Sequence, residues 1–370
     1  MKAIIVGAGV MGMMLARELG QAGMEVLLLE RRACGREASW AGGGIVSPLY
    51  PWRYHPAITA LTRWSQHYYP NLVQTLDAET GLDAEISHAG LLMVSVADRD
   101  QALDWARAND YRMDDIQGAA LHELEPALSK AFSSGLWMPQ VASVRNPRLC
   151  RALRASLARL PNVCVRETCE VSGLVIQAGR AKGVLADSGA VSGDRVILAA
   201  GAWTGRLLEP LGLTLPVVPV KGQMIAFGAR PRDVRHIVLA DGRYVIPRRD
   251  GLVVAGSTLE HTDFSKTPTE EAREALRDAA IRMIPSLASC PVVAHWAGLR
   301  PGSPQGIPFI GEVPGVRGLY VNAGHYRNGL VTAPASVALL KALLLEEASP
   351  VDPAPYALDG RLEAASLEEA

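Results

Sequence analysis

The first thirty residues constrain the fold of this chain more than any other stretch. Lys2 to Val6 form a short apolar run, and a turn with the spacing GxGxxG follows it directly. The apolar periodicity from Val10 to Ala22 then predicts a helix, and Glu25 to Leu29 predicts a second strand. A strand, a glycine turn, a helix and a strand in this order are typical of a unit that binds a dinucleotide.

Each glycine of the turn has its own expected role. Gly7 permits the tight turn, Gly9 lets the backbone approach a pyrophosphate, and Gly12 lets the helix pack closely on the strand. The free N–H groups and the positive end of the helix then face the phosphates. Glu30 ends the second strand, where a carboxylate accepts hydrogen bonds from the ribose hydroxyls of an adenosine and repels a 2′-phosphate. The pattern therefore disfavours NADP and leaves NAD and FAD open.

The composition argues against several other classes of protein. The chain has 370 residues, 49% of them hydrophobic, and a formal net charge of −1, so we expect neither a nucleic acid nor an anionic membrane as a partner. No run reaches the ~20 apolar residues of a membrane span, and the early glycine turn is unlike a signal peptide. The five cysteines form no CxxC pair and have no histidine at metal-ligand spacing. We therefore expect no metal, and reduced thiols in a cytoplasmic protein.

Beyond residue 30, the pattern predicts two interleaved domains. Residues 31–56 read as a long loop whose glycines can approach a flat or anionic ligand and whose Arg36 and Ser39 can contact phosphates, although a plain surface loop fits this stretch equally well. Helices are expected from Pro56 to Leu76, from Arg99 to Ala108 and from Pro147 to Leu160. A helix from about residue 269 to 284 has Thr267 as its cap candidate.

The fold class that follows is α/β. A Rossmann-like dinucleotide-binding domain, which the resemblance described below identifies as an FAD-binding domain, is expected to comprise residues 1–84, 145–218 and 297–347, with Gly201 at the carboxyl end of a parallel strand. A smaller α+β substrate domain, with a mostly antiparallel sheet, is expected at 85–144 and 219–296. Residues 348–370 form a proline-rich and then acidic tail that we expect to be frayed.

Six segments in a fixed order carry a family resemblance. They are GAGVMG with Glu30, SWAGGGIVSP, AAGAWTG, YVIPRRDGLVVAGST, GLRPGSPQGIPFIG and GLYVNAGHYRNGL. In this order they resemble the flavin amine oxidases of the D-amino-acid oxidase family, and among these the glycine oxidases of the bacterial thiamine pathway. The resemblance covers about residues 1–345. It implies FAD as the cofactor and not NAD.

The resemblance also implies site residues. Arg300 and Tyr244 match the family's clamp for the substrate carboxylate, which is chemically sensible because a guanidinium fork pairs bidentately with a carboxylate and a phenol adds a third hydrogen bond. Arg327 matches a residue near the entrance or the substrate. From the residues alone, a surface arginine and a core tyrosine remain the alternatives. The implied cofactor-binding set is Gly7, Gly9, Gly12, Glu30, Arg31, Ser39, Gly42, Gly43, Val171, Gly201, His325, Arg327, Asn328 and Gly329.

The last helix and the cysteines complete the predicted site. If Asn328 and Gly329 open the helix against the flavin, its dipole favours the anion that forms on flavin reduction. Sarcosine oxidases hold their flavin through a cysteine in the segment that reads GLRPG here, and this segment has none, so we expect non-covalent FAD. Gly242 and Leu259 replace a histidine and a methionine of similar enzymes, which leaves the substrate preference open.

The implied activity is the oxidative deamination of glycine and similar small amines, such as sarcosine and D-alanine. The products are a 2-oxo acid, ammonia and hydrogen peroxide, with dioxygen as the acceptor, and the imine can serve thiamine thiazole synthesis. His325 is an alternative general base in this reaction. The rival readings are a dehydrogenase with another acceptor, a non-catalytic subunit of an amine oxidase complex and an NAD dehydrogenase. Whether the chain forms a homo-oligomer stays open.

Overall fold

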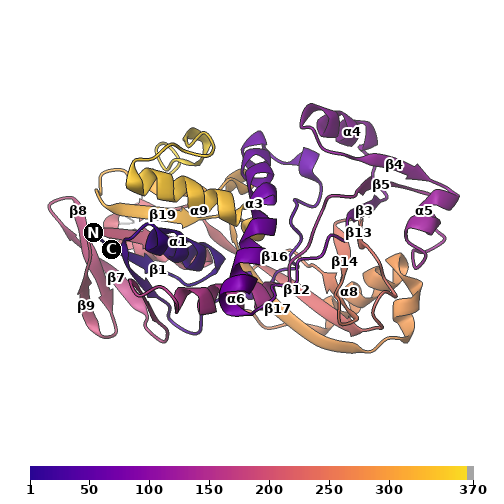
Figure 1. Cartoon of the computed structure of the whole chain (residues 1–370), viewed down its shortest axis with the longest axis horizontal. Coiled ribbons are helices and arrows are strands. Elements are labelled where there is room, and N and C mark those ends of the chain that lie inside the picture. The colour runs from indigo at the N-terminus through magenta and orange to yellow at the C-terminus, as the bar shows by residue number, and fades with distance from the viewer. Residues whose placement is uncertain (365–370) are drawn as a thin grey trace.

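The computed structural model describes residues 1–364, and a mainly parallel sheet forms the centre of one half of it (Figure 1). The strand order of this sheet is β18-β19-β10-β1-β2-β6. All neighbours are parallel except β18 and β19. The strands are β1 (Lys2–Val6), β2 (Glu25–Leu29), β6 (Val163–Arg166), β10 (Arg195–Leu198), β18 (Phe309–Glu312) and β19 (Leu319–Ala323).

The strand order reverses at β1, because β2 lies on one side of it and β10 on the other. Ligands of open parallel sheets bind beyond the carboxyl ends of the strands at such a switch point. The carboxyl ends of β1, β2, β10 and β19 come together there, although β10 and β19 are far from β1 in the sequence. The glycine turn and Glu30 therefore lie at the position that the first thirty residues predict.

A second sheet forms the other half of the protein (Figure 1). Its order is β16-β12-β15-β14-β13-β3-β5-β4, and β17 also pairs with β12. Every pair is antiparallel except β13 with β3, in agreement with the predicted antiparallel character. The strands are β3 (Leu91–Val94), β4 (Asp114–Gln117), β5 (Ser134–Met138), β12 (Val218–Gly228), β13 (Ile237–Ala240), β14 (Arg243–Pro247), β15 (Leu252–Gly256), β16 (Glu260–His261) and β17 (Val292–Gly302).

The remaining elements are small. A three-stranded sheet joins β7 (Val171–Gln177), β8 (Arg180–Ala186) and β9 (Gly189–Ser192). The helices outside the core of the first sheet are α2 (Ala38–Ala41), α4 (Arg99–Ala108), α5 (Ala119–Leu124), α7 (Thr204–Leu208) and α8 (Glu270–Met283). Single 3-10 turns are η1 (Pro51–Arg53), η2 (Gly201–Trp203), η3 (Glu209–Leu211), η4 (Pro285–Ser289), η5 (Pro304–Gly306) and η6 (Ala354–Tyr356). Residues 297–302 of β17 belong to the second sheet, although the sequence prediction assigns them to the first domain. The division into domains stays a prediction.

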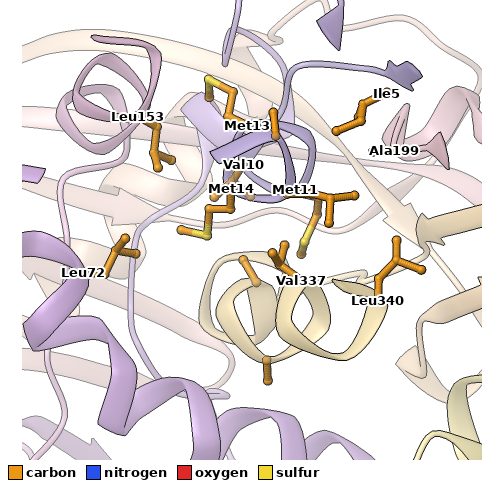
Figure 2. Packing of buried hydrophobic residues seen from close by; sticks show 14 of the residues in the cluster. Ile5, Val10, Met11, Met13, Met14, Leu72, Leu153, Ala199, Val337 and Leu340 are labelled. Atoms are coloured by element: carbon orange, nitrogen blue, oxygen red, sulfur yellow. The ribbon is translucent and has the colours of Figure 1, made fainter. Parts of the chain in front are cut away.

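Four helices form the core beside the first sheet: α1 (Val10–Gln21), α3 (Pro56–Thr80), α6 (Asn146–Leu157) and α9 (Gly329–Leu345). Figure 2 shows the methionines of α1 between Leu72 of α3, Leu153 of α6 and Val337 of α9. These side chains are almost completely excluded from solvent. Helix α9 is apolar on nearly every side because α1 and α3 both pack against it. Its buried position explains why its sequence shows no polar face.

Close packing of α1 on the glycine turn depends on Gly12. A Cβ at Gly12 would lie 1.9 Å from the carbonyl oxygen of Gly7, which no side chain can occupy. Gly7 itself has φ of +101°, a conformation that favours glycine. The predicted roles of both residues therefore follow from the packing of the backbone.

Two predictions about the chain are wrong. Helix α8 begins at Glu270, and the hydroxyl that accepts its backbone N–H, from Ala272, belongs to Thr269 and not to Thr267. The tail is not frayed where the structure describes it: Tyr356 is buried and donates a hydrogen bond to the carbonyl of Ala57 (2.7 Å). β20 (Glu363–Ala364) also pairs with β11 (Leu213–Thr214). Residues 365–370 lie outside the described part of the chain.

Candidate functional site

A cavity of about 330 Å³ extends from the glycine turn to the second sheet. Its size is within the range of pockets that hold organic ligands. Of the predicted cofactor and substrate residues, all except Gly12 line it. Gly12 packs beneath the turn, as described above. The structure thus brings together side chains from the two ends of the sequence, and their roles in binding stay predictions.

Glu30 organises the nucleotide end of the cavity. Its Oε2 accepts the backbone N–H of Ala8 (2.8 Å), and its Oε1 accepts that of Arg32 (3.0 Å). These bonds hold the carboxylate in one orientation, and each oxygen keeps a lone pair for a ligand hydroxyl. Val171 lines the cavity beside Cys169, whose backbone N–H donates to the carbonyl of Glu30 (2.8 Å).

The first turn of α1 borders the next part of the cavity. Gly9 and Val10 line it, and Ser39 accepts the N–H of Val10 at 2.9 Å. Arg31 also lines the cavity, but its guanidinium is paired with Glu37 (3.2 Å) and lies 3.9 Å from the ring centroid of Trp203. Arg36, the other arginine predicted near the phosphates, is exposed and does not line the cavity.

The first turn of α9 opens on the same cavity. Asn328 precedes the helix, Gly329 and Leu330 line the cavity, and no acidic residue lies in this turn. The first N–H groups of a helix have no partner within it. The positive ends of α1 and α9 therefore both face one cavity, which favours a ligand with negative charge at two places.

Unpartnered polar atoms at the cavity support a bound cofactor. Asn146 Oδ1, Asn322 Oδ1 and Asn328 Nδ2 are buried and have no hydrogen-bond partner among the described residues. All three residues line the cavity. Each such atom costs about 1–3 kcal/mol unless a ligand or water satisfies it. Together with the two helix ends and Glu30, these atoms fit the ribose, phosphates and polar ring edge of FAD.

Arg300 lies at the opposite end of the cavity, on β17. Its Nη2 donates to Ser257 Oγ (2.6 Å), and its Nη1 donates to the carbonyl oxygen of Thr258 (3.2 Å). Gly222 makes room for it, because a Cβ there would lie 2.2 Å from the guanidinium. Burial lowers the pKa of Arg300, and the charge of Arg327 acts in the same direction. No carboxylate lies within 4 Å of Arg300 among residues 1–364, so its charge is available to an anionic ligand.

Tyr244 lines the cavity from β14, two strands away from the strand that pairs with β17. It is 7% exposed, and its hydroxyl lies 3.9 Å from Met224 Sδ. A Cβ at Gly43 would lie 3.3 Å from this hydroxyl, so the glycine loop leaves space directly beside it. The side chains of Tyr244 and Arg300 therefore reach one end of the same cavity, as a carboxylate clamp requires.

Several residues at the site have no signal in the sequence that identifies them singly. Ser257 lines the cavity and holds Arg300. Arg248 is buried and donates to the carbonyl of Gly43 (2.6 Å), which fixes the glycine loop. Both residues lie in the segment YVIPRRDGLVVAGST that carried the resemblance, so the motif contained them but assigned them no role. Leu259, one of the two residues that replace a histidine and a methionine of similar enzymes, is 43% exposed and does not line the cavity.

The carboxylates that line the cavity are all at its nucleotide end. They are Glu30, Glu37 and Glu170, and within residues 1–364 none borders the cavity beside Tyr244 or Arg300. The described chain also contains no cluster of three or more metal-ligating side chains. Within residues 1–364, none of the helices combines the length and the apolar character of a membrane span. Because the lining carboxylates are all at the nucleotide end, no carboxylate of residues 1–364 is a candidate for acid–base catalysis beside Tyr244 and Arg300.

His325 is completely buried, and its Nε2 lies 3.1 Å from Ser336 Oγ. Burial lowers its pKa from 6.5 to about 3, so the ring is neutral at neutral pH and is a weak base. The structure thus disfavours the alternative in which His325 acts as general base. It instead gives His325 a packing and hydrogen-bonding role next to α9.

This burial predicts a pH effect on stability. Between about pH 6.5 and pH 3, His325 is protonated in the unfolded chain but stays neutral in the folded chain. The free energy of unfolding therefore falls as the pH drops from about 6.5 toward 3. We expect His325→Gln to reduce this slope by up to about 1.4 kcal/mol per pH unit. Urea titrations of flavin-saturated protein between pH 4 and 7 measure it, with the exposed His67→Gln as control. An unchanged slope in His325→Gln would contradict this reading.

Comparisons with known proteins agree with this geometry. A family model described as DAO, FAD dependent oxidoreductase, matches residues 2–343. A glycine oxidase of Pseudomonas aeruginosa is 54% identical over 361 residues, which cover 98% of this chain and 99% of that protein. The bifunctional protein ThiO/ThiG of Trichormus variabilis is 30% identical over 94% of this chain and 53% of its own length. The crystal structure of glycine oxidase from Geobacillus kaustophilus has a TM-score of 0.91 at 27% identity, covering 97% of this chain and 98% of that one.

Proposed function

The chain belongs to the DAO family of FAD-dependent oxidoreductases, and from this premise we propose that it is a glycine oxidase. It converts glycine and similar small amines, such as sarcosine and D-alanine, to a 2-oxo acid and ammonia. One observation carries the proposal: Arg300 has no carboxylate partner in the described chain and lies with Tyr244 at the end of the cavity opposite Glu30. This is the arrangement that a small amino acid and a dinucleotide cofactor need within one site.

The residues of this chain act mainly by placing the substrate. Arg300 pairs with the carboxylate, and the hydroxyl of Tyr244 adds a hydrogen bond to it. This contact fixes the orientation of the α-carbon, which replaces a random encounter by a single productive geometry. Arg327 adds a second positive charge at the same end of the cavity. When FAD is bound, it supplies the acceptor for the hydride of the α-carbon and returns the electrons to dioxygen.

At the end of the cavity with Arg300 and Tyr244, no carboxylate of residues 1–364 can accept a proton from the substrate. Because the acidic residues of the cavity surround its nucleotide end and His325 is a weak base, the substrate enters the reaction as the free amine. The chain then needs no residue to remove a proton from carbon. The N-termini of α1 and α9, which both line the cavity, would stabilise negative charge on a bound FAD.

The wider biological setting belongs to the same proposal. Relatives that combine ThiO with ThiG suggest that the imine product is used for the thiazole of thiamine. The five cysteines are all free thiols, which supports a cytoplasmic location. We also propose the predicted domain boundaries, the roles given above for the site residues and dioxygen as the acceptor. A quinone-linked dehydrogenase differs from the proposed oxidase only in the acceptor.

Purified protein tests the function directly. We expect a flavin absorbance spectrum that bleaches when glycine, sarcosine or D-alanine is added without oxygen. In air, the same substrates should yield hydrogen peroxide in proportion to the 2-oxo acid. Bleaching without peroxide would support a dehydrogenase. Absence of bleaching in the isolated chain would support a non-catalytic subunit.

FAD is expected to be held without a covalent bond. Cys169 is the one cysteine of residues 1–364 that lines the cavity, and its backbone N–H donates to the carbonyl of Glu30, which places it at the nucleotide end. Acid precipitation should therefore release all yellow colour into the supernatant. Colour that stays with the precipitated protein would contradict this expectation.

A further inference from the structure

Arg300 is held by one short segment, residues 257–260, which follows β15. Its Nη2 donates to the hydroxyl of Ser257 (2.6 Å), and its Nη1 donates to the carbonyl oxygen of Thr258 (3.2 Å). The carbonyl oxygen of Lys221 on β12 is a more distant acceptor for the same Nη1 (3.4 Å). The direction in which the guanidinium points therefore depends on how this segment is fixed to β12.

The segment pairs irregularly with β12. The pairing of β15 with β12 ends with Gly256 opposite Met224, and the pairing of β16 with β12 starts with Glu260 opposite Lys221. Three residues of the segment therefore face only two residues of β12, which makes a bulge. A bulge interrupts the regular ladder of hydrogen bonds and redirects the groups of the bulged strand.

Within the bulge, the side chain of Thr258 takes the place of its own main-chain carbonyl. The hydroxyl of Thr258 accepts the backbone N–H of Gln223 (2.8 Å), and the backbone N–H of Thr258 donates to the carbonyl of Gln223 (3.2 Å). In a regular antiparallel pair, a main-chain carbonyl would accept the N–H of Gln223. Because the hydroxyl accepts it here, the carbonyl of Thr258 is left to accept the hydrogen bond from Arg300.

Glu260 holds this hydroxyl in place. Its Oε1 accepts the hydrogen bond of the Thr258 hydroxyl and one from Gln223 Nε2 (2.9 Å), and its Oε2 pairs with Lys221 Nζ (2.9 Å). Burial raises the pKa of Glu260, but the hydrogen bonds from Thr258, Lys221 and Gln223 outweigh this effect and lower the pKa below its usual value. The carboxylate is therefore charged at neutral pH and is a strong acceptor for the hydroxyl.

The same network also fixes the start of α8. Gln223 Oε1 accepts the backbone N–H of Thr269 (2.8 Å), and this donor sets the orientation of the amide so that Nε2 faces Glu260. His295 Nε2 lies 3.0 Å from the same Oε1 and donates to it. A loss of stability on mutation is therefore expected in any case, and only an effect on the ligand of Arg300 shows a role in the site.

We propose that Glu260 is a positioning residue of the carboxylate clamp and acts on Arg300 through Thr258. The inference rests on the proposed function, in which Arg300 binds the carboxylate of the substrate. Neither Glu260 nor Thr258 lines the cavity, so neither touches the substrate itself. The role of Glu260 is to fix the hydroxyl of Thr258 and, through it, the carbonyl that orients the guanidinium.

The charge of Glu260 and its hold on Thr258 have opposite effects on a bound carboxylate. The negative charge repels an anionic ligand, so removal of the charge alone would tighten binding. Loss of the hold on Thr258 turns the guanidinium away from its fork geometry and weakens binding. We expect the second effect to be larger, because Lys221 already neutralises the charge of Glu260.

Binding of methoxyacetate tests the sign of this effect without turnover. This ligand is sarcosine with an ether oxygen in place of the nitrogen. Isothermal titration of the FAD-loaded enzyme is expected to show about three- to ten-fold weaker binding in Glu260→Gln and about ten-fold weaker binding in Thr258→Val. Thr258→Ser keeps the hydroxyl and should restore binding to within about two-fold of the wild type. Tighter or unchanged binding in Glu260→Gln would overturn the proposal.

Thr80→Val is the control for the loss of a hydroxyl elsewhere. The hydroxyl of Thr80 donates to the carbonyl of Leu76 (2.6 Å) in α3, and Thr80 does not line the cavity. Its replacement should leave the affinity for methoxyacetate unchanged. The FAD content of every variant, measured from the flavin absorbance, should equal that of the wild type, because Glu260 and Thr258 do not line the cavity in which FAD binds.

A double-mutant cycle separates positioning from stability. Thr258→Val should lower kcat/KM for glycine by about ten-fold, mainly through KM, and should have no further effect in the Arg300→Met background. The loss of stability in urea should be the same in both backgrounds. An equal loss of kcat/KM in both backgrounds would overturn the proposal. Glu260, whose side chain is 32% exposed, supplies the same cycle through Glu260→Gln if Thr258→Val does not fold.

Failure of this inference and failure of the proposed function give different results. A wild-type KM for glycine in both Glu260→Gln and Thr258→Val would overturn the positioning role and leave the glycine oxidase intact. Absence of flavin bleaching by glycine in the wild-type enzyme would overturn the proposed function. The titrations with methoxyacetate would still test the positioning of Arg300 in that case, because they need no turnover.

Discussion

Replacing Arg300 with methionine is expected to lower kcat/KM for glycine by about 150- to 5,000-fold. In the proposed function the guanidinium is the buried partner of the substrate carboxylate, and removal of one partner from such a pair costs about 3–5 kcal/mol. Most of the loss should appear in KM, because the contact is present in the bound substrate as well as in the transition state. Stopped-flow bleaching of the flavin by glycine, without oxygen, separates binding from the chemical step.

Two controls show whether the loss is due to the missing guanidinium and not to a loss of FAD. Arg300→Lys keeps the charge but not the fork, so it should recover only part of the loss. The FAD content should stay at the wild-type level, because the contacts of Arg300 are to Ser257 and Thr258 and not to the nucleotide end. Normal KM for glycine in Arg300→Met, with full FAD content, would rule out the clamp.

Replacing Gly12 with alanine is expected to destabilise the protein by about 3 kcal/mol and to leave most molecules without FAD. The added Cβ would lie 1.9 Å from the carbonyl oxygen of Gly7 and 3.1 Å from its carbon, both of which are backbone atoms. Helix α1 or the turn has to move, and overpacking of this kind costs about 1–3 kcal/mol. The same movement displaces the N–H groups that face the phosphates.

Urea unfolding and the ratio of flavin to protein absorbance measure the two effects. Gly173→Ala is the matched control, because the nearest atom to its added Cβ is Leu185 Cδ1 at 3.5 Å, an ordinary contact. It should keep wild-type stability and flavin content. Full flavin content in Gly12→Ala would show that the turn tolerates a wider gap between helix and strand than the structure indicates.

Local features of the fold could be predicted from the sequence with good accuracy. The strand Glu25–Leu29 and the helix Arg99–Ala108 have the predicted bounds, because their apolar periodicity is complete within the segment. The cap of α8 was misplaced by two residues, since both Thr267 and Thr269 precede a pair of acids and only the backbone of the folded loop distinguishes them. The proline-rich and then acidic composition of the tail predicts a frayed end, because nothing in this composition indicates that Tyr356 contacts Ala57.

The site residues fall into two groups: those that a short sequence segment identifies, and those whose proximity only the fold shows. The glycine turn and Glu30 can be identified from the sequence because one short segment contains the turn, the start of the helix and the carboxylate together. The resemblance to a family added Tyr244, Arg300 and Arg327, but no local pattern places them near each other. Their proximity depends on the register of β14, β15, β12 and β17, in which β14 and β15 form a hairpin while β12 pairs with two strands far from it in the sequence, β15 and β17.

The sequence by itself therefore determined a dinucleotide site, an α/β fold and, through the order of six segments, the flavin family. Only the tertiary structure decided that Tyr244 and Arg300 reach one end of the same cavity and that Arg300 has no carboxylate partner among residues 1–364. The physical reason is that charge balance depends on distance in space. A sequence with net charge −1 can still hold unpaired arginines where the pairing of its strands keeps the acids elsewhere.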